Sequence, residues 1–237
     1  MLNDFKEKIV KNFKFYNFST EKAEIFFSTN INGIDFKKDT KEGKRFLSML
    51  PEWFNFEKVI YLNQTHSNDI LVDPKEVIDG DGIITSKEKV AIGVFGADCT
   101  PIIIHDKHNG IVGAVHSGWK GTLNGILTEC IQKLINSFNS KCNDIEIFIG
   151  PHARRCCYEV NYELIDEFNS KELYRGHIND GRMLNLTECI KLQLKELGIK
   201  EENIHDIGKC TICNKEFHSY RRDKESSGRN FAFVFLK

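Results

Sequence analysis

Long apolar runs without polar alternation are the feature that most constrains the fold of this chain. The segments VAIGVFG at 90–96, GIVGAVH at 110–116 and IEIFIG at 145–150 place Ile, Val and Phe at successive positions. A strand with one face in water alternates apolar and polar residues, whereas these runs predict strands buried on both faces. Such strands need a covering layer on each side, so the sequence predicts a layered architecture.

Shorter segments complete the predicted elements. Further strand candidates cover 24–29, 58–62, 69–72, 82–85, 101–105, 205–211 and 231–236. After Trp119, apolar residues from Leu123 to Ile135 recur every three or four positions and predict an amphipathic helix. Other helix candidates cover 41–50, 161–169 and 186–197. The order of elements indicates an α/β or α+β fold with helices covering a large mixed β-sheet, organised as one domain over residues 1–237.

Composition excludes several classes of protein. Hydrophobic residues make up 41% and charged residues 28%, which is ordinary for a globular chain and not for a disordered one. The 33 basic and 34 acidic residues nearly cancel, so the charge indicates neither nucleic acid nor a membrane as partner. No stretch approaches the roughly 18 apolar residues that span a bilayer.

The cellular setting follows from the start of the chain and from its cysteines. The opening MLNDFKEKIVKNF carries scattered charges in place of the apolar core of a signal peptide. We therefore expect a cytoplasmic protein whose eight cysteines are mostly reduced thiols. Nothing in the sequence indicates an assembly, so we expect a monomer.

Three segments place reactive side chains near strand ends, where α/β proteins carry functional groups. They are NQTHSND with His66, GADCTP with Cys99 and AVHSGWKGT with His116. Two imidazoles and a thiolate suit Zn²⁺, and three protein ligands leave its fourth position open, as in catalytic sites. Because the ligands are far apart in sequence, only the fold can bring them together.

The same residues allow other interpretations. Cys99 could be a nucleophile with His116 as its base, or the three side chains could be a buried thiol and two hydrogen-bonded imidazoles. Asp98 could orient an imidazole, carry a proton or cap the turn before Thr100. Spacing alone leaves these alternatives open.

Other cysteines and arginines give weaker signals. Cys210 and Cys213 form a Cys-x-x-Cys pair without a second such pair, and we interpret them as packing or spectator thiols. The adjacent Cys156 and Cys157 are interpreted as core residues. Five of the eight arginines lie at 154–155 and 221–229, which indicates either an anion site or surface ion pairs.

Six blocks, taken together, resemble the YfiH family, also called the laccase-domain or multicopper polyphenol oxidase-like family. The blocks are NQTH at 63–66, DGIIT at 81–85, GADCTP at 96–101, AVHSGWKGT at 114–122, IGP at 149–151 with CYEV at 157–160, and CT at 210–211 with SYRRD at 219–223 and GR at 228–229. The likeness covers the chain from about Lys44 to its C-terminus.

The resemblance implies a layered YfiH-like α/β fold and a zinc site formed by His66, Cys99 and His116. It also implies an enzyme that cleaves adenosine, inosine, guanosine or methylthioadenosine with phosphate and deaminates adenosine. We therefore expect a zinc-dependent purine nucleoside phosphorylase with adenosine deaminase activity. Because a bacterial branch of the family is linked to peptidoglycan editing, the alternative is a cysteine-dependent hydrolase acting on a peptidoglycan precursor.

Purine nucleosides and phosphate are thus the expected partners. The expected catalytic residues are the three zinc ligands and Asp98. The candidates for binding nucleoside or phosphate are Arg45, Asn63, Gln64, Lys120, Tyr158, Arg221 and Arg229. The chain departs from the usual family pattern at Thr65, Ser67, Lys120 and 152–155, which leaves the preferred substrate open.

The spacing of the histidines tests whether the chain could be a multicopper oxidase, as the family name suggests. Multicopper oxidases bind their copper cluster through His-x-His pairs, and none of the eight histidines here forms such a pair. Multicopper chemistry is therefore not expected, although Cu²⁺ could displace zinc in vitro because it binds nitrogen and sulfur ligands more tightly.

Overall fold

Two six-stranded mixed β-sheets pack face to face in the computed structural model, which describes residues 5–237. Residues 1–4, which open the segment expected to contain no signal peptide, lie outside the described residues. The first sheet has the order β1 (Lys6–Val10), β2 (Phe13–Ser19), β3 (Ala23–Ser28), β14 (Asn230–Leu236), β7 (Val90–Gly96) and β4 (Lys58–Ile60). The second has the order β13 (Ile204–Asp206), β10 (Ile145–Ile149), β8 (Thr100–Asp106), β9 (Ile111–Ser117), β6 (Gly82–Thr85) and β5 (Ile70–Val72).

The core between the sheets confirms that the apolar runs are strands buried on both faces. It joins side chains of β3, β7 and β14 to side chains of β6, β8, β9 and β10. Every residue of β7, β8, β9 and β14 is buried. The mixed α/β class is confirmed, and the predicted strands are shared between two sheets because each sheet covers the inner face of the other.

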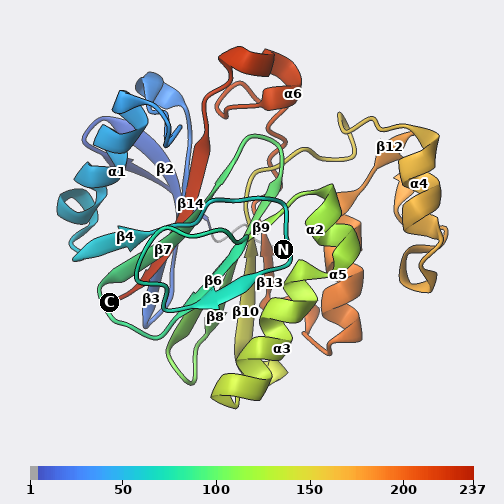
Figure 1. Ribbon diagram of the computed structural model, residues 1–237, viewed down its shortest axis with the longest axis horizontal. Coiled ribbons are helices and arrows are strands. Elements are labelled where there is room, and N and C mark those ends of the chain that lie inside the picture. The colour runs from blue at the N-terminus through green and yellow to red at the C-terminus, as the bar shows by residue number, and fades with distance from the viewer. Residues whose placement is uncertain (1–4) are drawn as a thin grey trace.

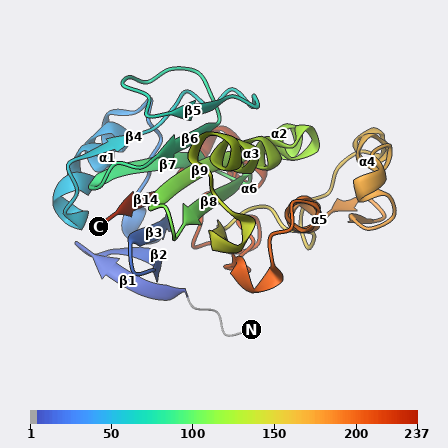
Figure 2. The ribbon, with the colours of Figure 1, turned by 90° about the horizontal axis from the view of Figure 1, so that it is seen from below.

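Helices cover the outer faces of both sheets (Figures 1 and 2). Helix α1 (Lys41–Phe54) packs on the first sheet, whereas α3 (Ile126–Phe138) and α5 (Leu186–Glu196) pack on the second. The predicted helix after Trp119 is divided, because Gly125 adopts a φ of 78° that ends α2 (Trp119–Asn124) before α3 begins. Within residues 5–237, no helix combines the length and the apolar character needed to cross a membrane.

The remaining elements lie at the periphery. Helix α4 (Tyr162–Asn169) and the short pair β11 (Asn179–Asp180) and β12 (Met183–Leu184) lie at the end of the molecule far from α1 (Figure 1). Helix α6 (Tyr220–Asp223) precedes β14. The sequence did not predict the β1–β2 hairpin, because β1 is an exposed edge strand with the charged sequence KEKIV.

Replacing Gly93 by alanine is expected to destabilise the fold by about 1–3 kcal/mol, the usual cost of overpacking. The added methyl group would overlap the Phe231 ring and lie 2.6 Å from the carbonyl oxygen of Ala232. The matched control is Gly113→Ala in β9, where the nearest atom would lie at an ordinary 3.4 Å. Urea denaturation should give a lower free energy of unfolding for the first variant only, and equal values would contradict the packing argument.

Candidate metal centre and active site

Strand register brings Cys99, His116 and Asp81 to one end of the second sheet. Strands β8 and β9 are antiparallel with Pro101 opposite His116, so Cys99, which precedes β8, lies beside the end of β9. Strands β6 and β9 pair Gly82 with Val115, and the next bond along joins the His116 amide to the Asp81 carbonyl at 2.8 Å. Residues far apart in sequence therefore meet because neighbouring strands end together.

His66, on the loop after β4, completes a candidate metal centre. One ligand atom from each of His66, Cys99 and His116 lies within 4.8 Å of the others. The distance from Cys99 Sγ to His66 Nε2 is 3.8 Å, close to the roughly 3.5 Å expected for sulfur and nitrogen on one tetrahedral zinc. The three side chains therefore fit a zinc ion as its ligands.

Two backbone features allow this approach. His66 adopts the left-handed region with a φ of 59°, a conformation that residues other than glycine seldom adopt. Gly118, which precedes α2, has no side chain, and a Cβ there would lie 3.0 Å from Cys99 Sγ and 3.1 Å from His66 Cδ2. A larger residue at position 118 would therefore crowd the ligands.

Asp81 orients two of the three candidate ligands. Its fully buried carboxylate lies 2.7 Å from His116 Nδ1, which leaves Nε2 as the free ring nitrogen. Its other oxygen accepts the Ser67 amide at 2.7 Å and the Thr65 amide at 3.0 Å, on either side of His66. Burial opposes the charge of Asp81, but the bonds from His116 and Ser67 outweigh it and hold its pKa far below the usual range. Such outer carboxylates fix the orientation of metal-binding histidines.

The Asp81 contribution was missed by sequence reasoning. The residue stands in the DGIIT motif directly before a buried strand, and this position was the only signal that could have identified it.

Cys99 and His116 shift each other's pKa. Burial raises the pKa of the Cys99 thiol, but the neighbouring charge of His116 and hydrogen bonds from both histidines outweigh it and lower the pKa to about 6. Burial lowers the pKa of His116, but the Cys99 thiolate and Asp81 together raise it to about 9. Both shifts favour a Cys99 thiolate beside a protonated His116 when no metal is bound.

Alkylation of the metal-free protein should report this ion pair. Because the thiolate is the reactive form, the rate at Cys99 should rise through pH about 6, not through the ordinary thiol value of about 8.5. The measurement is iodoacetamide modification against pH, with Cys99 followed by peptide mass. In the His116→Ala control the midpoint should move upward, and an unmoved midpoint would show that His116 does not stabilise the thiolate.

Asp98 anchors the turn that carries Cys99. Its φ is 105°, and its carbonyl oxygen accepts the Ala153 amide at 2.8 Å. One carboxylate oxygen accepts the Thr211 hydroxyl at 2.7 Å, and the other accepts the Arg221 amide at 2.6 Å. These contacts support a positioning role for Asp98, and proton transfer by this residue stays a prediction.

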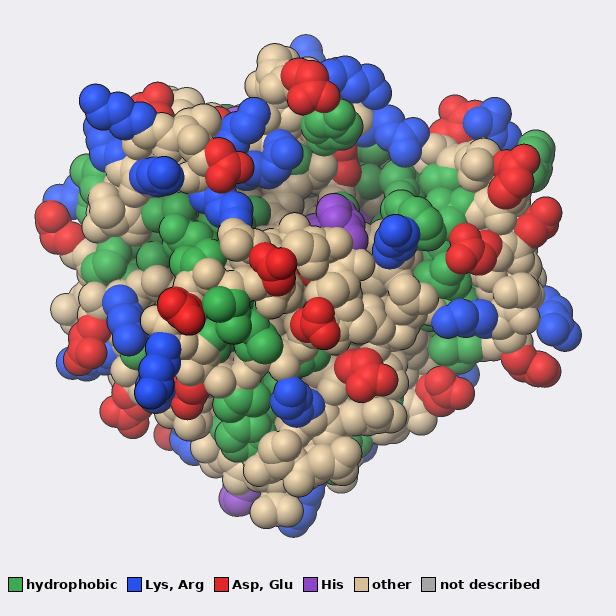
Figure 3. Space-filling view, in the orientation of Figure 1, with side chains coloured by type: hydrophobic (Ala, Val, Ile, Leu, Met, Phe, Trp, Pro, Cys, Tyr) green, Lys and Arg blue, Asp and Glu red, His purple; other side chains and the backbone are tan. Residues whose placement is uncertain are grey.

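The three candidate ligands line a hollow of about 470 Å³. The hollow is also lined by Lys37, Lys38, Asp39, Gln64, Phe95, Gly96, Ala97, Tyr220 and Arg229. Figure 3 shows a histidine side chain in a hollow of this face, with Lys and Arg side chains gathered beside it. Three of the lining side chains are basic and one is acidic, so the hollow suits an anion. The sequence motifs did not indicate Lys37, Lys38 or Tyr220.

Two of the predicted binding residues, Gln64 and Arg229, line this hollow, and a third, Asn63, contacts its lining residue Lys38. Gln64 accepts the Phe95 amide at 2.7 Å and donates to the Phe95 carbonyl at 2.8 Å, so it ties the His66 loop to β7. Asn63 accepts a hydrogen bond from Lys38 and holds that ammonium group. The Arg229 guanidinium donates to the Gly228 carbonyl at 2.9 Å.

Three others lie beside a neighbouring recess. The Arg221 guanidinium lies 5.4 Å from the centre of the Tyr158 ring, and both line this recess together with Trp119. Burial raises the pKa of Tyr158 to about 12. Lys120 is exposed, and its ammonium group lies 5.8 Å from the Trp119 ring.

Arg45 and Arg154 are engaged elsewhere. Arg45 lies on the exposed face of α1, pairs with Glu42 at 2.9 Å and lines neither recess. Arg154 forms a bidentate pair with Asp206 at 2.8 and 2.9 Å, so ion pairing is its observed role.

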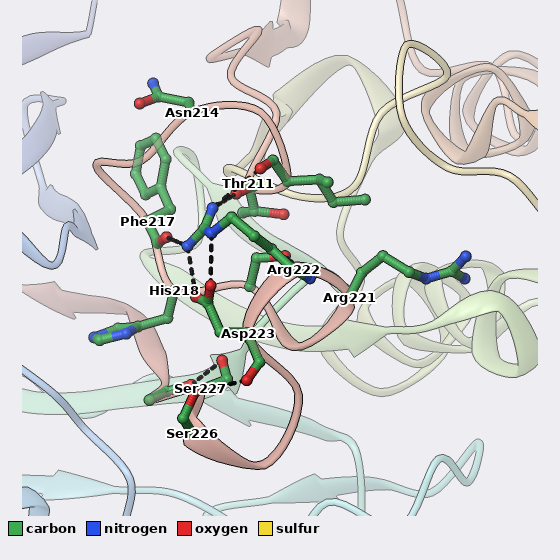
Figure 4. Close-up of polar contacts among 12 residues, drawn as sticks. Thr211, Asn214, Phe217, His218, Arg221, Arg222, Asp223, Ser226 and Ser227 are labelled. Atoms are coloured by element: carbon green, nitrogen blue, oxygen red, sulfur yellow. Dashed lines mark hydrogen bonds and ion pairs between the residues drawn. The ribbon is translucent and has the colours of Figure 1, made fainter.

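Arg222 holds together the segment that carries Tyr220 and Arg221 (Figure 4). Its guanidinium donates to the carbonyls of Thr211 and Phe217, both at 2.7 Å, and pairs with Asp223 at 2.7 Å. The Arg221 side chain extends away from this network (Figure 4). Arg222 therefore anchors α6 to the loop whose Thr211 bonds Asp98.

Two stacked mixed sheets with a Cys/His group at a strand end define an α/β protein with a candidate metal-dependent active site. The chain matches, over residues 21–237, the family described as multi-copper polyphenol oxidoreductase laccase, and it belongs to this laccase-like, YfiH-type family. The family and fold class predicted from the sequence are confirmed.

The chain is similar to known proteins in sequence and in fold. The chain is 41% identical over 235 residues to a purine nucleoside phosphorylase of Clostridium acetobutylicum, covering 97% of this chain and 99% of that protein. The crystal structure of YlmD from Geobacillus stearothermophilus superposes with a TM-score of 0.87 at 24% identity and covers 99% of each chain. YfiH of Bacillus licheniformis gives 0.83 at 24% identity, covering 91% of this chain and 93% of that one.

Proposed function

We propose that this protein is a zinc-dependent purine nucleoside phosphorylase that also deaminates adenosine. The proposal rests on one observation: His66, Cys99 and His116 converge in a hollow that also holds three basic side chains. The purine nucleoside phosphorylase of Clostridium acetobutylicum, which is similar over nearly the whole chain, supports the substrate class. The proposed substrates are adenosine, inosine, guanosine and methylthioadenosine.

Phosphorolysis would use the basic side chains to hold phosphate. A phosphate oxygen forms a bond to C1′ of the ribose, the bond from C1′ to purine N9 breaks, and N9 leaves with the electron pair and takes up a proton. Lys37, Lys38 and Arg229 line the hollow and would hold the phosphate against C1′. Tyr220 and Phe95 offer aromatic surface for the purine.

The metal would be held by His66, Cys99 and His116, with His116 oriented by Asp81. When bound, zinc supplies a Lewis acid that stabilises negative charge developing in the reaction. Deamination would add water at C6 of adenosine and release ammonia. Zinc fits better than a copper cluster because the candidate metal group of His66, Cys99 and His116 contains no His-x-His pair.

The test pairs zinc content with a nucleoside assay on protein purified without chelator. Each of the four nucleosides is incubated with and without phosphate, and free base, ribose 1-phosphate and ammonia are measured. Base release that depends on phosphate, with zinc present, is the expected result. Zinc without turnover of any nucleoside would overturn the proposal, whereas metal-independent activity on a cell-wall precursor would favour the cysteine-dependent hydrolase.

Replacing Arg229 by alanine should raise the KM for phosphate about 10–100-fold, because a hydrogen bond to a charged group contributes about 1.5–3 kcal/mol. The side chain lines the hollow, and within residues 5–237 its hydrogen bonds are to the carbonyls of Ser227 and Gly228 beside it in the chain, so the fold should survive. Initial rates against phosphate concentration measure the effect. Arg45→Ala is the matched control on the exposed face of α1, and an equal change in both variants would argue against a phosphate site at Arg229.

We further propose that residues 1–237 act as one domain and as a monomer in the cytoplasm, with purine nucleosides and phosphate as its small-molecule partners. The shared core of the two sheets supports the single domain.

A further inference from the structure

Four cysteine side chains meet outside the candidate active site. Cys156 and Cys157 come from the loop after β10, and Cys210 and Cys213 come from the loop after β13. Their four sulfur atoms all lie within 4.8 Å of one another, and Cys156 Sγ lies 4.0 Å from Cys213 Sγ. The interpretation of Cys156 as a core residue is wrong, because it is exposed. The sequence holds no second Cys-x-x-Cys pair, but the fold places Cys156 and Cys157 beside Cys210 and Cys213.

The backbone fixes the two segments independently of the sulfur atoms. His152 and Cys210 form a parallel bridge in which the Thr211 amide donates to the His152 carbonyl at 3.0 Å. The first pair sits on a turn closed by the Tyr158 amide and the Arg154 carbonyl at 2.9 Å. The second pair sits on a turn in which the Asn214 amide donates to the Cys210 carbonyl at 3.1 Å. The fold therefore brings the four thiols close together.

The spacing fits a metal and not a disulfide. Two sulfur atoms on one tetrahedral zinc are about 3.8 Å apart, since each zinc–sulfur bond is about 2.3 Å. A disulfide needs sulfur atoms about 2.05 Å apart, and all eight cysteines of the structure are free. A closed set of four thiolates is the usual ligand set of structural zinc sites.

We propose that Cys156, Cys157, Cys210 and Cys213 bind a second, structural Zn²⁺. Binding converts four thiols to thiolates, releases four protons to solvent and changes no oxidation state. The site is distinct from the one formed by His66, Cys99 and His116, and the proposal does not depend on nucleoside turnover.

This site would brace one wall of the active site. The first cysteine segment begins beside Ala153, whose amide bonds the Asp98 carbonyl, and it ends beside Tyr158. The second contains Thr211, whose hydroxyl bonds the Asp98 carboxylate at 2.7 Å. A zinc ion joining the two segments would hold both supports of the Cys99 turn together, and structural zinc contributes directly to folding free energy.

Zinc content of full-length variants, purified under reductant from zinc-supplemented cells, tests the proposal. We expect about two zinc ions per chain in the natural protein, about one in Cys99→Ala, about one in Cys213→Ser and almost none in the double variant. Cys213 is exposed, so its replacement removes a ligand without opening a cavity. Cys142→Ser is the matched control, because Cys142 belongs to neither group, and it should keep both ions.

Two further measurements protect the result against a variant that fails to fold. Cys99→Ala, with all four cysteines intact, should bind Co²⁺ with a strong thiolate-to-cobalt charge-transfer band. Thiol titration of the natural chain, denatured with chelator and without reductant, should find all eight cysteines. A Cys99→Ala protein free of zinc and without the cobalt band would overturn the second site, as would a thiol count reduced by disulfides. Loss of nucleoside turnover alone, with two zinc ions present, would overturn only the proposed enzyme.

Discussion

Replacing Cys99 by alanine is expected to abolish nucleoside turnover, with a loss of at least about 1000-fold, together with zinc at the active site. Cys99 is the only sulfur ligand of the three, and its removal leaves two imidazoles whose metal affinity is much lower. Metal ions typically contribute several kcal/mol of charge stabilisation, and each 1.36 kcal/mol is about tenfold in rate. The measurement is phosphate-dependent base release alongside zinc analysis.

Comparing His116→Ala with Cys99→Ala distinguishes a metal-ligand role of Cys99 from a nucleophile role. Under the proposed function, both variants lose active-site zinc and activity together, because both side chains are ligands. If Cys99 were a nucleophile, Cys99→Ala would lose activity and keep its zinc content, and His116→Ala would change the pH dependence of the rate. Unchanged zinc in Cys99→Ala would therefore contradict the metal centre, provided that the four-cysteine site is counted separately.

Replacing Asp81 by asparagine should lower the zinc affinity of the active site about 10–100-fold, the usual cost of losing an outer-sphere carboxylate. The buried carboxylate accepts from the His116 ring and from the Ser67 and Thr65 amides, and it fixes both the His116 ring and the loop that carries His66. Asparagine has nearly the same shape, but its amide nitrogen cannot accept these bonds.

Competition with a chromophoric chelator measures this affinity in the Cys213→Ser background, so that only one site is titrated. Asp79→Asn is the matched control, since Asp79 is an exposed carboxylate two residues earlier in the chain. Equal affinities for the two variants would show that Asp81 does not orient the ligands. A loss of stability without a loss of affinity would assign it a structural role only.

Much of the fold could be predicted because buried strands leave a strong local pattern. The runs at 90–96, 110–116 and 145–150 correspond to β7, β9 and β10 within one residue at each end. The hairpin of β1 and β2 could not be predicted, since its first strand is charged and exposed and gains its partner only in the folded sheet. The break at Gly125 was missed because the apolar spacing continues across it.

The candidate site was predictable where a residue belongs to a recognisable motif. His66, Cys99 and His116 were predicted together, and the structure brings their ligand atoms within 4.8 Å of one another. Lys37 and Lys38 were not predicted, because they lie in a polar loop whose position beside the hollow depends on packing. Arg45 was expected at the site, but it lies on the exposed face of α1, where it pairs with Glu42.

The sequence by itself determined the class of fold, the family and the three candidate zinc ligands, because these depend on residue type and local order. The tertiary structure alone decided which distant groups share a site. Asp81 meets His116 because β6 and β9 are paired, and Cys156 meets Cys213 because a bridge at 152 and 210 joins two loops. Contacts of this kind arise from strand pairing between distant segments, which local patterns of residues do not encode.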